Sequence, residues 1–215
     1  MTTLPHGEPP IRLPPECEPA LLERFLKAEA MALWAVRSAQ LQQVPPHVLR
    51  FLRKHEADEA THLKQFESLV QHTSHQRDRL PAVPQQWPAL AVHLYGYESL
   101  GLEFARLLSA LRPDLTSILA DEEIHVGFFE QEIGTLLHGD AAAGDHAKLS
   151  AKAWWRKLPK TLDRYLEGPA LAPFTERLTP FILDAIEQRF VGAGLLESVR
   201  SQTGNRYQTE TEGRP

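Results

Sequence analysis

A short acid–histidine pattern, Asp-Glu-x-x-His, occurs twice in this chain and has the spacing of a metal-binding motif. The first copy spans Asp58–His62 and the second spans Asp121–His125. Side chains three residues apart lie on one face of an α-helix, so the Glu and His of each copy can reach one ion. Two such pairs, with one Glu from each of two further helices, form the ligand set of a two-metal carboxylate site.

Apolar periodicity places four glutamates on faces that should be buried. Four segments, at about residues 20–43, 47–70, 89–111 and 114–138, have helical apolar spacing. Each has one Glu within its apolar stripe, and these are Glu29, Glu59, Glu98 and Glu122. Acidic side chains are almost never fully buried unless they are paired or bound to metal. Two divalent cations would cancel the four charges, whereas a metal-free interior would have to protonate some of the acids.

The third segment offers two candidate acids. Glu29 and Glu59 lie roughly 22 and 20 Å from the turn between their helices, so they should be level. Glu98 and Glu122 differ by roughly one helical turn in height, and Glu103 would match Glu122 better. Glu103, however, points about 140° away from Glu98 toward a more polar side. We prefer Glu98 on this basis and keep Glu103 as the alternative.

The chain has enough apolar material for one core, with 215 residues of which 42% are hydrophobic. Residues 1–19 are rich in proline and predict an extended arm, followed by a helical bundle over residues 20–138. Residues 71–88 are too long for a hairpin between the second and third helices. They predict a crossover that runs the length of the bundle.

The C-terminal part predicts additional helices. Residues 139–147 have small side chains and predict a linker, and residues 148–200 predict helices packed on the bundle. A basic segment with Trp154 and Trp155 can dock on a lipid surface or a partner, or can be an extra helix whose tryptophans pack inward. We favour inward packing. Residues 201–215 are polar and predict a disordered tail.

Composition excludes several other classes of protein. Cys17 is the single cysteine, which rules out disulfides within the chain and a four-cysteine iron site. The net charge of −5 argues against general affinity for nucleic acids. No signal peptide and no apolar run long enough for a stable membrane insertion is evident, so we expect a cytoplasmic protein.

Over residues 20–138 the chain resembles the ferritin-like superfamily of di-iron and di-manganese carboxylate proteins. The resemblance implies an all-α fold, a ferritin-like four-helix bundle with a long crossover between helices two and three. It also implies six metal ligands, which are Glu29, Glu59, His62, Glu98, Glu122 and His125. One Glu from each motif, Glu59 and Glu122, would bridge the two ions.

The repeated motif is similar to that of the bacterial hydrocarbon monooxygenases, in which the Asp hydrogen-bonds to a ligand His. Asp58 and Asp121 are therefore candidates for outer partners of the ligands, the alternative being ordinary charges at a helix edge. Tyr95 is a third candidate, with a buried tyrosine that has a satisfied hydroxyl as its alternative. His55, one turn before Glu59, is either an outer partner or a core histidine.

One departure from this resemblance concerns the third helix. The monooxygenases and desaturases often have a Thr three or four residues after the third-helix Glu, where this chain has Gly101 and Leu102. The small side chains there can leave room for a substrate or can simply let helices approach closely.

The function expected from these features is that of an oxygen-dependent non-haem di-iron oxidoreductase of the hydroxylase or oxidase type. Its cofactor would be two Fe ions, with Mn as the alternative metal. Its substrates would be dioxygen and a small molecule or modified biomolecule. An external protein would supply electrons, and the chain would be a monomer or a homodimer. The alternatives are a ferroxidase, peroxide-scavenging or other metal-handling protein, and a non-enzymatic helical scaffold.

Overall fold

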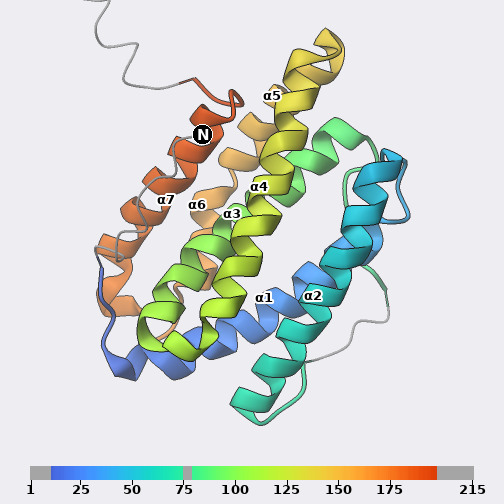
Figure 1. Ribbon diagram of the computed structural model, residues 1–215. Helices are drawn as coiled ribbons and strands as arrows, with labels where there is room; N and C mark the ends of the chain where they lie inside the picture. Colours follow the sequence, from blue (N-terminus) through green and yellow to red (C-terminus); the bar gives the residue numbers. More distant parts are fainter. Residues whose placement is uncertain (1–10, 75–78, 198–215) are drawn as a thin grey trace, which may run out of the picture.

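The computed structural model describes residues 11–74 and 79–197, and these ranges contain helices and connecting segments but no strand (Figure 1). The predicted all-α class is confirmed for them. The α-helices are α1 (Glu18–Ala39), α2 (Pro46–Val70), α3 (Trp87–Leu111), α4 (Thr116–His138), α5 (Ala141–Trp155), α6 (Leu158–Tyr165) and α7 (Thr175–Gly192). None of these helices is both long and apolar enough to cross a lipid bilayer.

The first four helices form two packed pairs. α1 lies along α2 and α3 lies along α4, and the pairs meet where α1 contacts α3 and α2 contacts α4. Apolar stripes explain this pairing, because each helix must bury its apolar face against a neighbour. Phe25 of α1 stacks on Phe66 of α2, for example, with 5.1 Å between the ring centroids. The two acid–histidine motifs lie on α2 and α4, one in each pair.

The two described ends of the connection between α2 and α3 lie at opposite ends of α1, as the crossover predicted from its length requires. Near its start, the His72 side chain hydrogen-bonds to Glu23 in the first part of α1. Near its end, the Ser38 hydroxyl donates to the carbonyl of Pro81, and Ser38 lies in the last turn of α1. Because α3 begins where α2 began, α2 and α3 run in the same direction (Figure 1).

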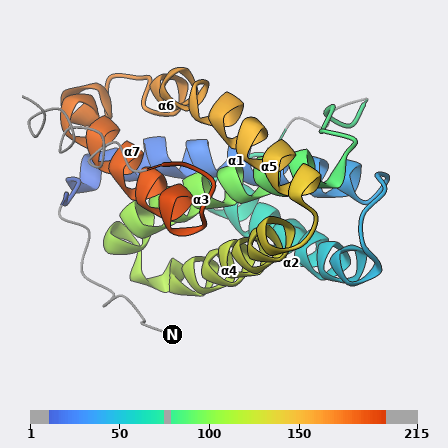
Figure 2. The same ribbon diagram turned by 90° about the horizontal axis from the view of Figure 1, so that it is seen from above.

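α3 is the central helix. It contacts α1, α4, α5 and α7, and most of its circumference is buried. A helix that is apolar nearly all round is expected in such a position. α5, α6 and α7 lie on the side of α3 that faces away from α2 (Figure 2). The predicted C-terminal helices therefore do pack on the first four helices.

Two of the predicted boundaries are wrong. Residues 139–147 do not form a linker, because α5 begins at Ala141 and the C-terminal helices start there rather than at residue 148. Asp140 caps α5 by accepting hydrogen bonds from the backbone of Ala142 and Ala143, and alanine is the best helix former. The first helix ends at Ala39, short of the predicted residue 43.

The predicted N-terminal arm is held on the protein over the part that the structure describes. Ile11 and Leu13 are buried, and Cys17 ends a 3₁₀ turn that leads into α1. Residues 1–10 of the arm and the predicted tail, residues 201–215, lie outside the described residues.

Trp154 of the basic segment points into the protein, which agrees with the packing interpretation. Its ring stacks on Phe190 of α7, with 5.2 Å between centroids. A Cβ atom added to Gly96 of α3 would lie 2.3 Å from the nearest Trp154 ring atom. Gly96 therefore lets α5 approach α3 closely enough for the indole to lie flat against the backbone.

We predict that Gly96→Ala lowers the free energy of unfolding. Displacing a packed ring costs about 1–3 kcal/mol, which exceeds the gain of about 0.5–1 kcal/mol from replacing a helical glycine. Gly134→Ala in α4 is the matched control, since its Cβ would meet nothing within 4 Å and the variant should gain stability. Urea denaturation measures both, and equal stabilisation of the two variants would contradict this account of Gly96.

Candidate metal centre

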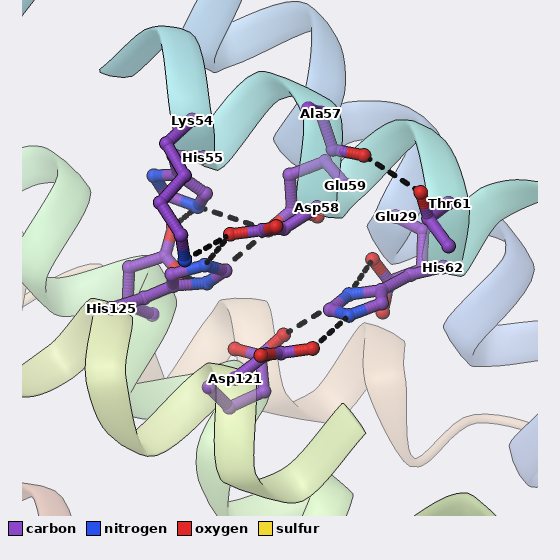
Figure 3. Close-up of polar contacts among 12 residues, drawn as sticks. Glu29, Lys54, His55, Ala57, Asp58, Glu59, Thr61, His62, Asp121 and His125 are labelled. Carbon is purple, nitrogen blue, oxygen red and sulfur yellow. Dashed lines mark hydrogen bonds and ion pairs between the residues drawn. The ribbon is translucent and has the colours of Figure 1, made fainter. Parts of the chain in front are cut away.

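The structure brings all six sequence-predicted metal ligands into one cluster and adds a seventh residue, His55. They come from α1, α2, α3 and α4, and each has a relative exposure of 5% or less. The cluster consists of Glu29, His55, Glu59, His62, Glu98, Glu122 and His125. Figure 3 shows the three imidazole rings turned toward the carboxylates between the helices.

The cluster divides into two groups, each able to hold one ion. The two-histidine group consists of His55, Glu59, Glu98 and His125, and the one-histidine group consists of Glu29, Glu59, His62 and Glu122. Within each group the donor atoms lie within 4.8 Å of one another. Donors about 2.1 Å from an ion can be at most about 4.2 Å apart, so each group needs to contract by less than about 1 Å. Glu59 belongs to both groups, whereas Glu122, the other predicted bridging residue, belongs to one.

The height mismatch expected between Glu98 and Glu122 is resolved because the two acids serve different groups. Nδ1 of His125 lies 3.6 Å from Glu98 Oε2, so Glu98 is level with the His of the second motif rather than with its Glu. Gly101, one turn after Glu98, is the α3 residue beside Glu122. A Cβ added there would lie 3.2 Å from Glu122 Oε2. Glycine at this position leaves room beside the carboxylate.

Each motif supplies the aspartate that contacts the histidine of the other motif. Nε2 of His125 lies 3.3 Å from Asp58 Oδ2, and Nε2 of His62 lies 3.2 Å from Asp121 Oδ2 (Figure 3). With Nε2–H donating to the aspartate, Nδ1 of each ring keeps a lone pair facing the glutamates. The predicted role of both aspartates as outer partners agrees with this geometry, but the pairing is between motifs rather than within them.

Lys54 adds a further contact to Asp58. The ammonium donates to Asp58 Oδ2 over 3.0 Å. Burial raises the pKa of the Asp58 carboxyl, but the hydrogen bonds from Lys54 and His125 outweigh it and hold the pKa below its usual value. Asp58 therefore stays ionised beside His125 and fixes the orientation of its ring.

Several buried oxygen and nitrogen atoms of the cluster, all of kinds that can bind a metal ion, have no hydrogen-bond partner among the described residues. They are Glu29 Oε2, Glu59 Oε2, His62 Nδ1, His125 Nδ1 and His55 Nδ1. Nδ1 of His62 is 3.5 Å from Glu29 Oε2, and Nδ1 of His125 is 3.5 Å from Glu59 Oε1. These distances are too long for good hydrogen bonds, but donors around one ion at a tetrahedral angle are about 3.4 Å apart. Apart from the outer nitrogen of His55, the orphaned atoms are therefore placed as metal donors would be.

Without metal, protons must carry the positive charge that the cluster needs. Burial raises the pKa of Glu29 to about 7 and that of Glu59 to about 8, and it raises the pKa of Glu122 well above its usual value. Burial alone would lower the pKa of His55, but the carboxylates of Glu98 and Glu59 raise it to about 10. The same His55 charge lowers the pKa of Glu98, against the effect of burial. Metal binding to these groups must release protons.

His55 is the cluster residue whose place the sequence indicates least specifically. It was assigned as an outer partner or a core histidine, yet Nε2 lies 2.9 Å from Glu59 Oε1 and 3.4 Å from Glu98 Oε1. The available signal in the sequence is its position one turn before Glu59 in the same apolar stripe.

Two candidates lie outside the cluster. Glu103 is buried on another side of α3, where its Oε1 accepts from Arg106 at 3.1 Å and lies 3.4 Å from Arg189 of α7. Of the two interpretations of Tyr95, the structure agrees with the buried tyrosine whose hydroxyl is satisfied and not with the outer partner, because its hydroxyl donates to the Arg189 carbonyl and its ring stacks on Phe190. Tyr95 is turned about 60° around the helix axis from Glu98, which is enough to direct it toward α7.

Three phenylalanines cover one end of the two-histidine group. Phe51 stacks on Phe128 with 3.5 Å between centroids, and Phe129 meets Phe51 edge-on. Phe51 lies 5.7 Å from the His55 ring and 6.1 Å from the His125 ring. These rings keep water away from the imidazoles and lower the local dielectric constant.

Comparisons of the chain with protein-family models, with curated proteins and with solved structures found no match. The geometry and chemistry of the cluster are therefore the basis on which a function can be inferred.

We predict that the metal-free protein loses stability as pH rises from 5.5 to 8.5. Glu29 and Glu59 bind protons more tightly when folded, so the stability they give below pH 4.5 is lost as pH rises through about 7 and 8. The raised pKa of His55 also makes the protein less stable as pH rises, between pH 6.5 and about 10. The pKa of Glu98 is lowered, so its titration does not contribute between pH 5.5 and 8.5. The loss should be on the order of a few kcal/mol, at about 1.4 kcal/mol per pKa unit.

Denaturant unfolding in the presence of a chelator measures this slope. Glu29→Gln should flatten it, whereas Glu56→Gln, outside the cluster on α2, should not. A metal-free protein whose stability rises over this pH window would contradict the charge state described above.

Proposed function

We propose that the cluster holds two divalent metal ions, iron or manganese, and that the chain is an oxygen-dependent di-iron oxidoreductase on a ferritin-like four-helix bundle. The observation that carries the proposal is the set of buried donor atoms in two groups that share Glu59. The pairing of α1 with α2 and of α3 with α4, joined by a long crossover, supports the bundle architecture.

The ligands in this proposal are the six predicted from the sequence. Glu29, His62 and Glu122 would hold one ion, Glu98 and His125 would hold the other, and Glu59 would bridge them. Asp58 and Asp121 would fix the imidazole rings and strengthen them as donors by accepting the outer N–H. A ligand set of carboxylates with imidazole suits both iron and manganese.

Two ferrous ions held by these residues would supply two electrons to dioxygen at one place. The protein contributes the dry surroundings: the glutamates and histidines are buried, and Phe51, Phe128 and Phe129 exclude water from one side. Gly101 leaves room for the Glu122 carboxylate, which a larger side chain on α3 would crowd. Electrons for repeated turnover would come from an external donor protein, and the substrate would be a small molecule or a modified biomolecule.

The test of this proposal is metal analysis followed by anaerobic loading. The protein should bind about two Fe²⁺ per chain and develop near-ultraviolet absorption bands when oxygen is admitted. Glu59→Gln should lose most of both ions, because Glu59 belongs to both groups. Glu56→Gln, on the same helix but paired with Arg37, is the control and should bind iron as the wild type does.

The sequence alternatives give different results in the same experiment. A helical scaffold would bind no stoichiometric metal, and Glu59→Gln would not change its metal content. A ferroxidase or peroxide-scavenging protein would bind iron and react, and native mass would find a shell-forming assembly in the case of a storage protein. An oxidoreductase should be a monomer or homodimer in native mass.

The crossed aspartate contacts predict which ion each aspartate affects. Asp58→Ala should weaken the ion held by His125, and Asp121→Ala should weaken the ion held by His62, each by about 10–100-fold. Asp163→Ala, an exposed residue of α6, is the control. Titration of the metal-free variants with Fe²⁺ under anaerobic conditions measures the two affinities. The crossed pairing is wrong if Asp58→Ala instead weakens the ion held by His62 and Asp121→Ala instead weakens the ion held by His125.

A further inference from the structure

The three histidines of the cluster are divided unequally between the two donor groups. We propose that His55 is itself a metal ligand, so that the two metal positions differ and the two-histidine position fills first. This inference rests on the proposed function, because it requires a site for two ions.

His55 is placed around the shared carboxylates much as His125 is. Its Nε2 lies 2.9 Å from Glu59 Oε1 and 3.4 Å from Glu98 Oε1. Nδ1 of His125 lies 3.5 Å from Glu59 Oε1 and 3.6 Å from Glu98 Oε2. Two imidazole nitrogens from α2 and α4 thus face the same two carboxylates, and the ring centroids are 3.8 Å apart. These four side chains therefore place four possible metal donors around one position.

The alternative role for His55 is that of a permanent cation that neutralises the acids. A protonated imidazole would have to stay close to two divalent cations, which would repel it. Its ring is also fully buried, so it cannot turn its charge toward water. As a ligand, His55 would carry no such charge, and its contact with Glu59 would be one between adjacent ligands, as the contact of His125 with Glu59 would be.

The two positions then differ in the kind of donor they offer. The two-histidine position has two nitrogens and two carboxylates, and the one-histidine position has one nitrogen and three carboxylates. Imidazole favours metals later in the Mn²⁺, Fe²⁺, Co²⁺ order, whereas carboxylate suits harder ions. Co²⁺ and Fe²⁺ should therefore enter the two-histidine position first, and the preference should be smallest for Mn²⁺.

The test uses Co²⁺ as the probe and does not depend on activity. Metal-free protein is titrated with Co²⁺ while proton NMR counts the exchangeable ring N–H signals that the paramagnetic ion shifts strongly. The first equivalent should shift two such signals, from His55 and His125, and the second should add one from His62. One shifted signal at the first equivalent, or two in total, would overturn the proposal with wild-type protein alone.

Variants assign the signals and the affinities. His55→Gln should remove one signal and weaken the first Co²⁺ by on the order of 10–100-fold or more. His62→Gln should instead affect the second ion. His47→Gln is the matched control, because His47 lies on the same helix but is half-exposed and hydrogen-bonds to Glu132. It should leave both binding steps unchanged.

The result also separates this inference from the proposed function. Wild-type protein that binds two Co²⁺, with His55→Gln binding both as tightly, leaves the two-metal site intact and overturns the role of His55. Wild-type protein that binds no Co²⁺ overturns both.

Discussion

The negative charge of four glutamates buried between four helices is the constraint on which the rest of this protein depends. A carboxylate inside a protein needs a compensating positive charge, and the cluster provides it with protons when no metal is bound. His55 and the raised pKa values of Glu29 and Glu59 are consequences of that need. Divalent cations would supply the same positive charge as these protons, so metal that enters the cluster would displace them. The proposed metal affinity and the folding stability would therefore both depend on pH.

The packing of the helices fixes which side chains of the site lie at the same height along the bundle. Glu98 is level with His125, and Gly101 is level with Glu122, because α3 and α4 are offset by about one turn. The crossed contacts of Asp58 and Asp121 tie α2 to α4, together with the Phe51–Phe128 stack and the hydrogen bond between His47 and Glu132. The outer partners of the histidines are thus also part of what joins the two helical pairs. The C-terminal helices cover the opposite side of α3 and leave the cluster to the first four helices.

Much of the candidate site could be predicted from the sequence, since helical spacing places residues three and four apart on one face whatever surrounds the helix. That rule found six residues of the cluster and preferred Glu98 over Glu103. It could not separate His55 from an ordinary core histidine, because periodicity gives the face of a residue but not its partner. It also could not tell that Tyr95 faces α7, a helix distant in sequence.

The sequence by itself determined the helices, their buried faces and the charge that those faces have to neutralise, because these follow from local spacing and residue type. Only the tertiary structure decided which donors meet: that Glu59 is shared, that each aspartate contacts the histidine of the other motif, and that His55 joins His125. These depend on the offset and rotation of one helix against another, which many side-chain contacts set together. The same packing made Gly96 the place where Trp154 lies against α3, a role that nothing in its local sequence indicates.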